Sequence, residues 1–178
     1  MYENMNLFRG KRKENGQWAI GSFHIYETKQ ISPINDKLQP EEIKYLIIRN
    51  SFADWNMPRT IESTEVDPET IGRFTGLIVS NVRVFEGDFL KFGDRIFEIF
   101  WNNEAFQWQA KQVDTDLENY RTYHGCHDYD WTITDLGWFA AEEIITGKIT
   151  TEIIGNKWDN PEILDKYKSK NVSQEFYF

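Results

Sequence analysis

The sequence predicts an α+β protein that is mostly β, formed as a bent antiparallel sheet or a small SH3-like barrel with an N-terminal hairpin and short C-terminal helices. Apolar and polar residues alternate with period two over several short segments, and turn signals separate these segments. Aromatic residues make up 16% of the 178 residues, which is too much apolar area for a disordered chain. The length suits one domain over 1–178. We divide it into a hairpin and loops (1–60), a β meander (61–111) and an acidic segment with a helix, a strand and a C-terminal helix (112–178).

The first sixty residues predict a hairpin followed by loops. The turn Glu14-Asn15-Gly16 joins two alternating segments, and Asn-Gly is a strong hairpin signal because both residues tolerate positive φ. Residues 27–43 predict a loop with one helical turn near Pro40, and residues 50–65 predict irregular structure. The strands expected in this part are 7–13, 17–26 and 45–49.

The middle of the chain has the clearest β pattern. Asp67-Pro68-Glu69 predicts a capped single turn before it. Alternation over 106–111 places Phe106 and Trp108 on one face and the glutamines on the other, and we expect these aromatics to pack in the core. The strands expected here are 82–85, 89–92, 95–101 and 106–111.

The last part of the chain predicts two helices around a strand. Apolar residues recur at helical spacing over 135–145, with Asp135 as the cap and Gly147 after the end. Residues 150–154 are β-branched and predict a strand. The order Asn160-Pro161-Glu162 is typical of a helix start.

The charge is distributed unevenly along the chain. The net charge is −9, and the first sixty residues carry nine Lys and Arg against seven Asp and Glu. Residues 61–178 carry eleven against twenty-two, so the chain repels phosphate backbones and general nucleic-acid binding is disfavoured. We expect the basic cluster in the first strand and turn to be a solvated face or a guarded strand edge: Arg9, Lys11, Arg12 and Lys13.

The location of the protein is predicted from what the sequence lacks. A single Cys excludes an intramolecular disulfide and fits a reducing compartment. No apolar run approaches the ~20 residues that cross a bilayer, and the first residues lack the pattern of a signal peptide. We therefore expect a soluble cytoplasmic protein with no membrane partner.

Three ordered segments of the chain form one pattern. The first runs from Leu7 to Gly21 and contains Asn15-Gly16-Gln17-Trp18. The second joins Val66-Asp67-Pro68-Glu69-Thr70-Ile71-Gly72-Arg73-Phe74-Thr75-Gly76-Leu77 to Val84-Phe85-Glu86-Gly87-Asp88-Phe89-Leu90. The third is Ile153-Ile154-Gly155-Asn156-Lys157-Trp158-Asp159-Asn160-Pro161-Glu162-Ile163-Leu164. In this order, the three segments together resemble the YopX protein family of phages and prophages.

The resemblance implies a mostly β fold and a phage or prophage origin, and it implies no chemistry. We expect the residues of its motifs to be structural, with the glycines at turns or close backbone approaches. These residues are Gly72, Phe74, Gly76, Leu77, Glu86, Gly87, Asp88, Gly155 and Asn156.

One local cluster has the residue types of a metal site or a thiol nucleophile. His124, Cys126, His127 and Asp128 lie close together, and imidazole and thiolate are good zinc ligands. The spacing differs from that of structural zinc motifs, and nucleophilic Cys-His pairs are normally assembled from distant residues. A polar loop is the simpler interpretation, so we expect no metal, no cofactor and no catalytic residue.

The leading hypothesis is a non-enzymatic binding or accessory protein of phage or prophage type. It would act through an acidic aromatic surface on a protein partner, such as a basic host protein. Two alternatives stay open: a metal- or thiol-dependent enzyme centred on 124–130, and a self-assembling structural component that forms homo-oligomers.

Overall fold

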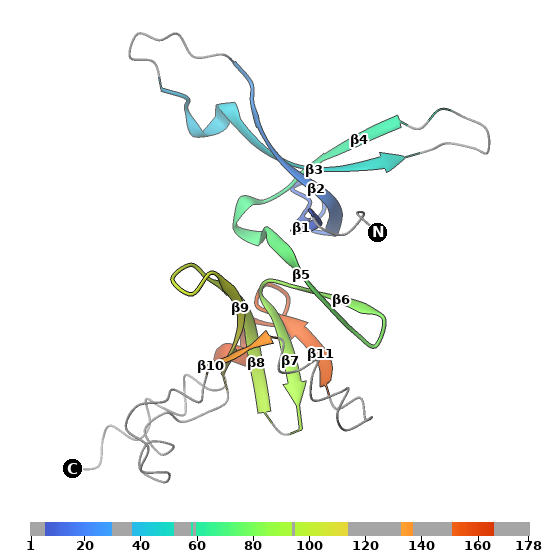
Figure 1. Ribbon diagram of the computed structural model, residues 1–178. Coiled ribbons are helices and arrows are strands. Elements are labelled where there is room, and N and C mark those ends of the chain that lie inside the picture. Colours follow the sequence, from blue (N-terminus) through green and yellow to red (C-terminus); the bar gives the residue numbers. More distant parts are fainter. Residues whose placement is uncertain are drawn as a thin grey trace. The chain divides into compact units, whose positions relative to one another are not determined.

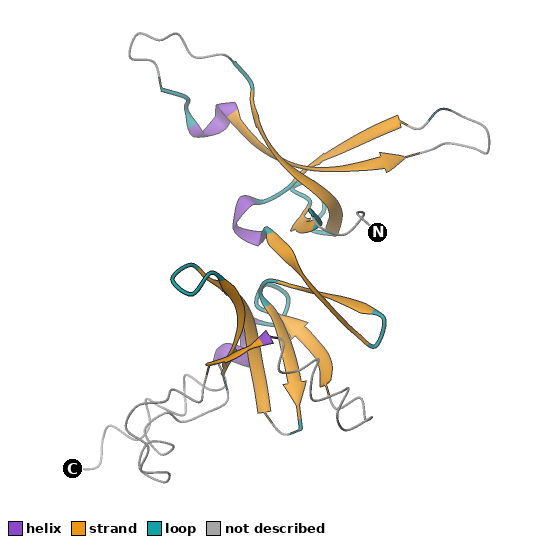
Figure 2. Ribbon diagram, viewed as in Figure 1, coloured by secondary structure: helices purple, strands orange, loops and turns teal. Residues whose placement is uncertain are grey.

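The computed structural model describes residues 6–29, 37–51, 58, 60–93, 95–113, 133–136 and 151–165. These residues form two antiparallel sheets and are mostly β, which confirms the predicted composition of the fold (Figures 1 and 2). Neither sheet closes into a barrel. The SH3-like alternative is therefore wrong for the described residues, and open antiparallel sheets take its place.

The chain divides into two compact units, Met1–Phe74 and Thr75–Phe178. The boundary lies within strand β5 (Gly72–Val79), whereas the divisions predicted from the sequence were at 60/61 and 111/112. Strand β5 was not predicted. Its beginning pairs with β1, where Arg9 faces Gly72, and it continues into the second unit, where it neighbours β6.

The first unit contains the predicted N-terminal hairpin. Its strands are ordered β4-β3-β2-β1 and then the start of β5, and Phe8 faces Gly21 across the hairpin. Gly16 has a φ of 71°, and its N–H donates to the carbonyl of Arg12 at 2.8 Å, so the glycine of the Asn-Gly signal takes the left-handed conformation that glycine favours. The strands are β1 (Phe8–Lys11), β2 (Trp18–Glu27), β3 (Ile43–Ser51) and β4 (Thr60–Glu65).

Strand β4 corrects the prediction of irregular structure over 50–65, because Thr60–Glu65 pairs with β3 along its whole length. The end of β4 then meets the end of β1 through a single antiparallel bridge between Arg12 and Val66. Val66 is fully buried and packs with Ala19 and Ile47 in the core of this unit. The sheet therefore curves around a small apolar core.

Two single 3-10 turns precede strands of the first unit, as the sequence predicted. The turn η1 (Pro40–Glu42) leads into β3, and the turn η2 (Pro68–Thr70) leads into β5. The carboxylate of Asp67 accepts a hydrogen bond from the N–H of Glu69, which confirms the predicted cap.

The second unit contains the predicted meander in a sheet ordered β10-β9-β8-β7-β11. A core of Val79, Val84, Leu90, Phe97 and Ile99, with Ala110 and Leu136, packs against this sheet. The strands of this unit, besides the end of β5, are β6 (Val82–Phe85), β7 (Asp88–Phe92), β8 (Arg95–Asn102), β9 (Gln107–Gln112), β10 (Ile133–Asp135) and β11 (Thr151–Asn156).

Helical structure is scarce among the described residues. The predicted C-terminal helix is confirmed over 161–165. Asp135, the predicted cap of a helix over 135–145, belongs instead to strand β10, where it pairs with Gln109. Residues 137–145 of this predicted helix lie outside the described residues. None of the helices described is long and apolar enough to cross a membrane.

Candidate functional site

The cluster with metal-ligand residue types lies outside the described residues: His124, Cys126, His127 and Asp128. Its arrangement stays a prediction. In the part of the chain that the structure does describe, no three His, Cys, Asp or Glu side chains come together in a way that could hold a metal ion.

Gly87 occupies a turn of the second unit that two other segments contact. Its N–H donates to the carbonyl of Ile99 at 2.8 Å, and its carbonyl accepts from the N–H of Lys157 at 2.9 Å. Its φ is 80°, and a Cβ at this position would lie 2.6 Å from the ring of Trp158. Both the backbone conformation and the packing therefore require glycine here.

Asp88 begins strand β7 directly after this turn and is 2% exposed. Its Oδ2 accepts a hydrogen bond of 2.7 Å from the N–H of Phe85, which closes the turn between β6 and β7. Asp88 also faces Asn156 in the pairing of β7 with β11. The second and third motif segments of the chain thus meet at one end of this sheet, with the half-buried Glu86 in the same turn.

Gly155 and Asn156 shape the turn that follows β11. Gly155 has a φ of 150° at a register shift, and a Cβ there would overlap Oδ1 of Asn160. Oδ1 of Asn156 accepts from the N–H groups of Trp158 and Asp159, at 3.1 and 2.9 Å. Nδ2 of Asn156 donates to the Asp159 carboxylate at 2.8 Å, so the buried amide stabilises the turn on both sides.

The remaining motif residues lie along β5. Gly72 and Phe74 are buried in the first unit, where the N–H of Phe74 donates to the carbonyl of Leu7 at 2.8 Å. Gly76 has a φ of 90° and open space around it, and Leu77 packs against the core of the second unit. Phe74 and Leu77 thus make contacts within the fold, and the structural role of the motifs stays a prediction.

The basic cluster of the first strand is divided between two kinds of contact. Arg9 and Lys11 lie over the ring of Trp18, at 4.6 and 5.5 Å from its centroid. Arg12 pairs with Glu14 at 3.6 Å, and Nζ of Lys13 lies 2.7 Å from a carboxylate oxygen of Glu65. The four cations therefore all make contacts within the first unit.

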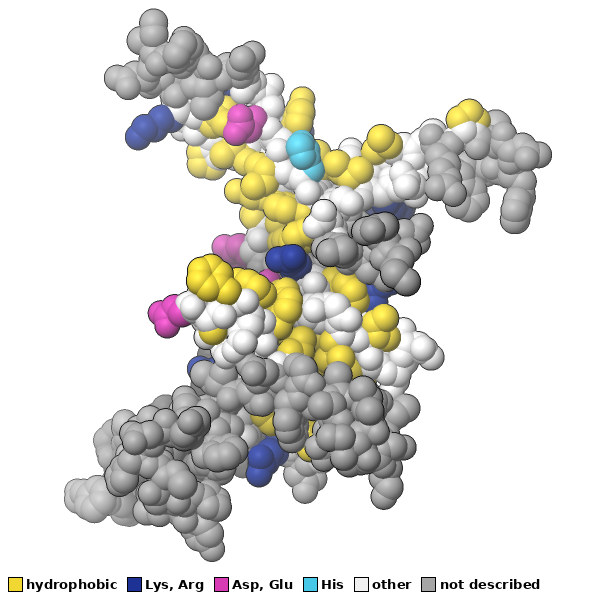
Figure 3. Space-filling view, viewed as in Figure 1, with side chains coloured by type: hydrophobic (Ala, Val, Ile, Leu, Met, Phe, Trp, Pro, Cys, Tyr) yellow, Lys and Arg dark blue, Asp and Glu magenta, His cyan; other side chains and the backbone are white. Residues whose placement is uncertain are grey.

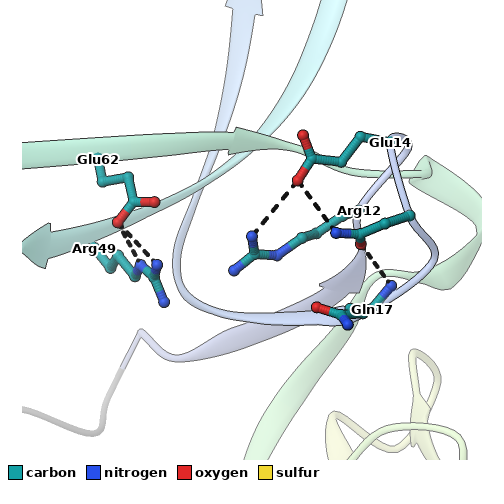
Figure 4. Close-up of polar contacts among 6 residues, drawn as sticks. Arg12, Glu14, Gln17, Arg49 and Glu62 are labelled. Carbon is teal, nitrogen blue, oxygen red and sulfur yellow. Dashed lines mark hydrogen bonds and ion pairs between the residues drawn. The ribbon is translucent and has the colours of Figure 1, made fainter.

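Two ion pairs lower the pKa values of the carboxylates of strand β4. Arg49 on β3 lies 2.8 Å from Oε2 of Glu62 on β4, and Figure 4 shows the two side chains reaching one another. Hydrogen bonding to Arg49 lowers the pKa of Glu62, and the pKa of Arg49 is raised in return. The pKa of Glu65 is lowered in the same way by its hydrogen bond to Lys13.

Phe106 does not lie in the core, where the sequence predicted it, because 80% of this residue is exposed. It lies in the turn between β8 and β9, before the first residue of β9, and its φ is 51°. A bulky residue is strained in this left-handed region, where Gly and Asn are favoured. Trp108 is half-buried and packs edge-on against Trp101, with ring centroids 5.2 Å apart.

Asn102 holds the turn that carries Phe106. Its Oδ1 accepts from the N–H groups of Glu104 and Ala105, at 2.8 and 3.1 Å. Its Nδ2 donates to the side chain of Gln109 on β9 at 2.8 Å. The exposed Phe106 thus lies in a turn in which the Asn102 side chain accepts from two backbone N–H groups, and the exposed Glu104 belongs to the same turn.

Other apolar side chains are also exposed, and the sequence pattern did not identify them. Figure 3 shows apolar side chains along the surface of the strands in both units. In the second unit they are Ile78 and Val82, which are 48% and 54% exposed. In the first unit they are Ile20, Ile25, Tyr26 and Ile61. Ile61 on β4 is the most exposed of these four, at 76%.

The comparison with known proteins found no protein-family model and no curated protein that matches the chain.

Proposed function

We propose that this protein is a non-enzymatic binding or accessory protein that docks on a protein partner through the turn carrying Phe106. The resemblance to YopX proteins supports a phage or prophage origin and action in the bacterial cytoplasm. The single observation that carries the proposal is an exposed aromatic residue with a left-handed φ, in a turn where the Asn102 side chain accepts from two backbone N–H groups.

Two features of Phe106 act against stability in the isolated chain. A left-handed φ costs an L-residue about 1–2 kcal/mol, and 80% of this residue is in contact with water. Strained residues persist at binding sites, where rigid aromatic anchors supply much of the affinity. Binding of the ring by a partner accounts for a phenylalanine at a position that suits Gly or Asn.

The charge around this turn favours a partner with a basic surface. Glu104 is exposed beside the ring, and residues 61–178 carry twice as many acidic as basic residues. Many of these acidic residues fall within 114–143, which lies largely outside the described residues. An apolar anchor beside carboxylates complements a pocket that is rimmed by Lys and Arg.

The test compares three proteins in capture experiments from bacterial lysate: the unchanged chain, Phe106→Asn and the control Val82→Thr. Val82 is also exposed but lies on β6, away from the turn. Loss of an anchor ring costs about 2 kcal/mol, which is roughly a 30-fold loss of affinity. We expect Phe106→Asn to lose the partner and Val82→Thr to keep it.

The stability of the variants is measured in parallel. Asn tolerates the left-handed region, so we expect Phe106→Asn to be as stable as the unchanged chain or more stable, by up to about 1 kcal/mol. A variant that captures the same partner with the same affinity as the unchanged chain would exclude Phe106 as the anchor.

A further inference from the structure

Strand β4 has one edge that β3 does not cover (Figure 1). The N–H of Val66 donates to the carbonyl of Tyr45 on β3 at 2.9 Å, which fixes the direction of the backbone groups along β4. Since these groups alternate along a strand, residues 62 and 64 bond to β3, and residues 61, 63 and 65 point to the outer edge.

The outer edge is occupied at one end. The carbonyl of Glu65 accepts a hydrogen bond of 3.1 Å from the N–H of Lys13, beside the bridge between Arg12 and Val66. Further along the strand, the outward N–H and C=O groups of Ile61 and Ser63 have no hydrogen-bond partner among the described residues. These groups form a short template for another strand.

The side chains of β4 protect this edge weakly. It contains no Pro and no Lys, and Ile61 is 76% exposed. Its two acidic residues are each engaged by a cation of the same unit: Arg49 pairs with Glu62 (Figure 4), and Lys13 pairs with Glu65. The charge that would repel an approaching strand is thereby reduced.

We propose that β4 pairs with β4 of a second copy of this chain, antiparallel and about a two-fold axis. A second copy fits because one register satisfies every outward group of both residues: Ile61 opposite Ser63 of the other copy, and Ser63 opposite Ile61. Pairing Ser63 with itself would instead set Ile61 against Glu65, whose carbonyl is already bonded to Lys13.

This register also determines the neighbours of each side chain. The two Ile61 side chains lie diagonally across the axis on one face and shield each other from water. On the opposite face each Glu62 lies beside the other, which opposes pairing, and the Arg49 bound to each carboxylate offsets this repulsion. The contact is small, so we expect a weak dimer that forms as concentration rises.

Sedimentation equilibrium over a wide concentration range tests the pairing. We expect the apparent mass to rise from 21.2 kDa toward twice that value. Ser63→Pro removes an outward N–H and no ladder hydrogen bond, and it should weaken the dimer by about 30-fold or more. Ile61→Lys should do the same, whereas the control Ile25→Lys should not, because Ile25 lies on β2, on the side of β3 away from β4.

Disulfide trapping tests the register in a Cys126→Ser background. Glu62→Cys places two thiols opposite each other across the axis, in the spacing that a disulfide accepts. Thr64→Cys is the matched control, because its two thiols would lie roughly 13 Å apart along the strands. We expect mild oxidation to crosslink Glu62→Cys into a dimer and to leave Thr64→Cys monomeric.

The outcomes separate this inference from the proposed function. A chain that stays at 21.2 kDa at all concentrations, a dimer that Ser63→Pro and Ile61→Lys leave intact, or crosslinking through residue 64 alone would each overturn it. Phe106→Asn should leave the dimer unchanged, since Phe106 belongs to the other unit.

Discussion

Replacing Gly87 with Ala should destabilise the second unit by about 1–5 kcal/mol. At a φ of 80° an alanine costs about 1–2 kcal/mol, and its Cβ would lie 2.6 Å from the ring of Trp158. Overpacking of this kind costs about 1–3 kcal/mol. Alanine also reduces the conformational entropy of the unfolded chain, which offsets about 0.4–1 kcal/mol of this loss. The net effect on the folded state is still destabilising.

Gly76→Ala is the matched control for this prediction. Gly76 has a φ of 90°, and a Cβ there would have no atom within 4 Å. Gly76→Ala therefore introduces the backbone strain without the steric overlap, and we expect it to lower the free energy of unfolding by about 1 kcal/mol. The difference between the two variants isolates the packing of residue 87 against Trp158.

Urea denaturation followed by circular dichroism measures both losses. Adding Trp158→Leu to Gly87→Ala should recover about 1–2 kcal/mol, because the smaller side chain gives the new methyl group room. If Gly87→Ala and Gly76→Ala lose the same stability, or if Trp158→Leu and Gly87→Ala are additive, then the contact with Trp158 does not explain the glycine.

Three further predictions concern other parts of the chain. Gly21→Ala would set a methyl group against the carbonyl oxygen of Ile48, and a backbone clash of this kind should lower the free energy of unfolding by about 3 kcal/mol, measured by urea denaturation. Pairing with Arg49 lowers the pKa of Glu62 from its ordinary value of 4.5. The stabilisation that the ionised Glu62 gives to the folded state is therefore complete above pH 4.5 and is lost as the pH falls through the lowered pKa. This stabilisation is small and is screened by salt. The free energy of unfolding should fall less steeply with acid in Glu62→Gln than in the unchanged chain. For 124–128, we expect elemental analysis of untagged protein to find a metal stoichiometry near zero and chelation to leave the melting temperature unchanged; a stoichiometric metal would favour the enzyme hypothesis.

Local signals predicted the elements that local chemistry determines. The Asn15-Gly16 turn forms because Gly16 adopts a φ of 71°, and the side chain of Asn15 accepts the N–H of Gln17 at 3.0 Å. The turn at Asp67 forms because its carboxylate caps the next N–H groups. In both places a few neighbouring residues supply the whole interaction, so the sequence pattern was sufficient.

Strand β4 was missed because its residues give no alternation of apolar and polar side chains. The segment from Thr60 to Glu65 contains one large apolar residue, Ile61, and that side chain is exposed. The strand is held by its backbone ladder with β3 and by the pairing of Glu62 with Arg49. Such a strand depends on a partner that the local sequence does not contain.

The candidate docking turn was partly predictable. Alternation correctly separated Trp108 from its neighbouring glutamines, but it also placed Phe106 inside the strand. Oδ1 of Asn102 accepts from the N–H groups of residues 104 and 105, and Phe106 lies in this turn, before the first residue of β9. An asparagine two residues before a loop amide is the signal that could have identified this turn.

The bridge between Arg12 and Val66 has a consequence for the order of folding. The β1–β2 and β3–β4 hairpins each join segments that are close in the chain, whereas the bond from Lys13 to Glu65 spans 52 positions. Closing so long a loop costs entropy that hairpin formation does not, so the bridge should form after both hairpins. A substitution at Val66 should then leave the refolding rate nearly unchanged and accelerate unfolding.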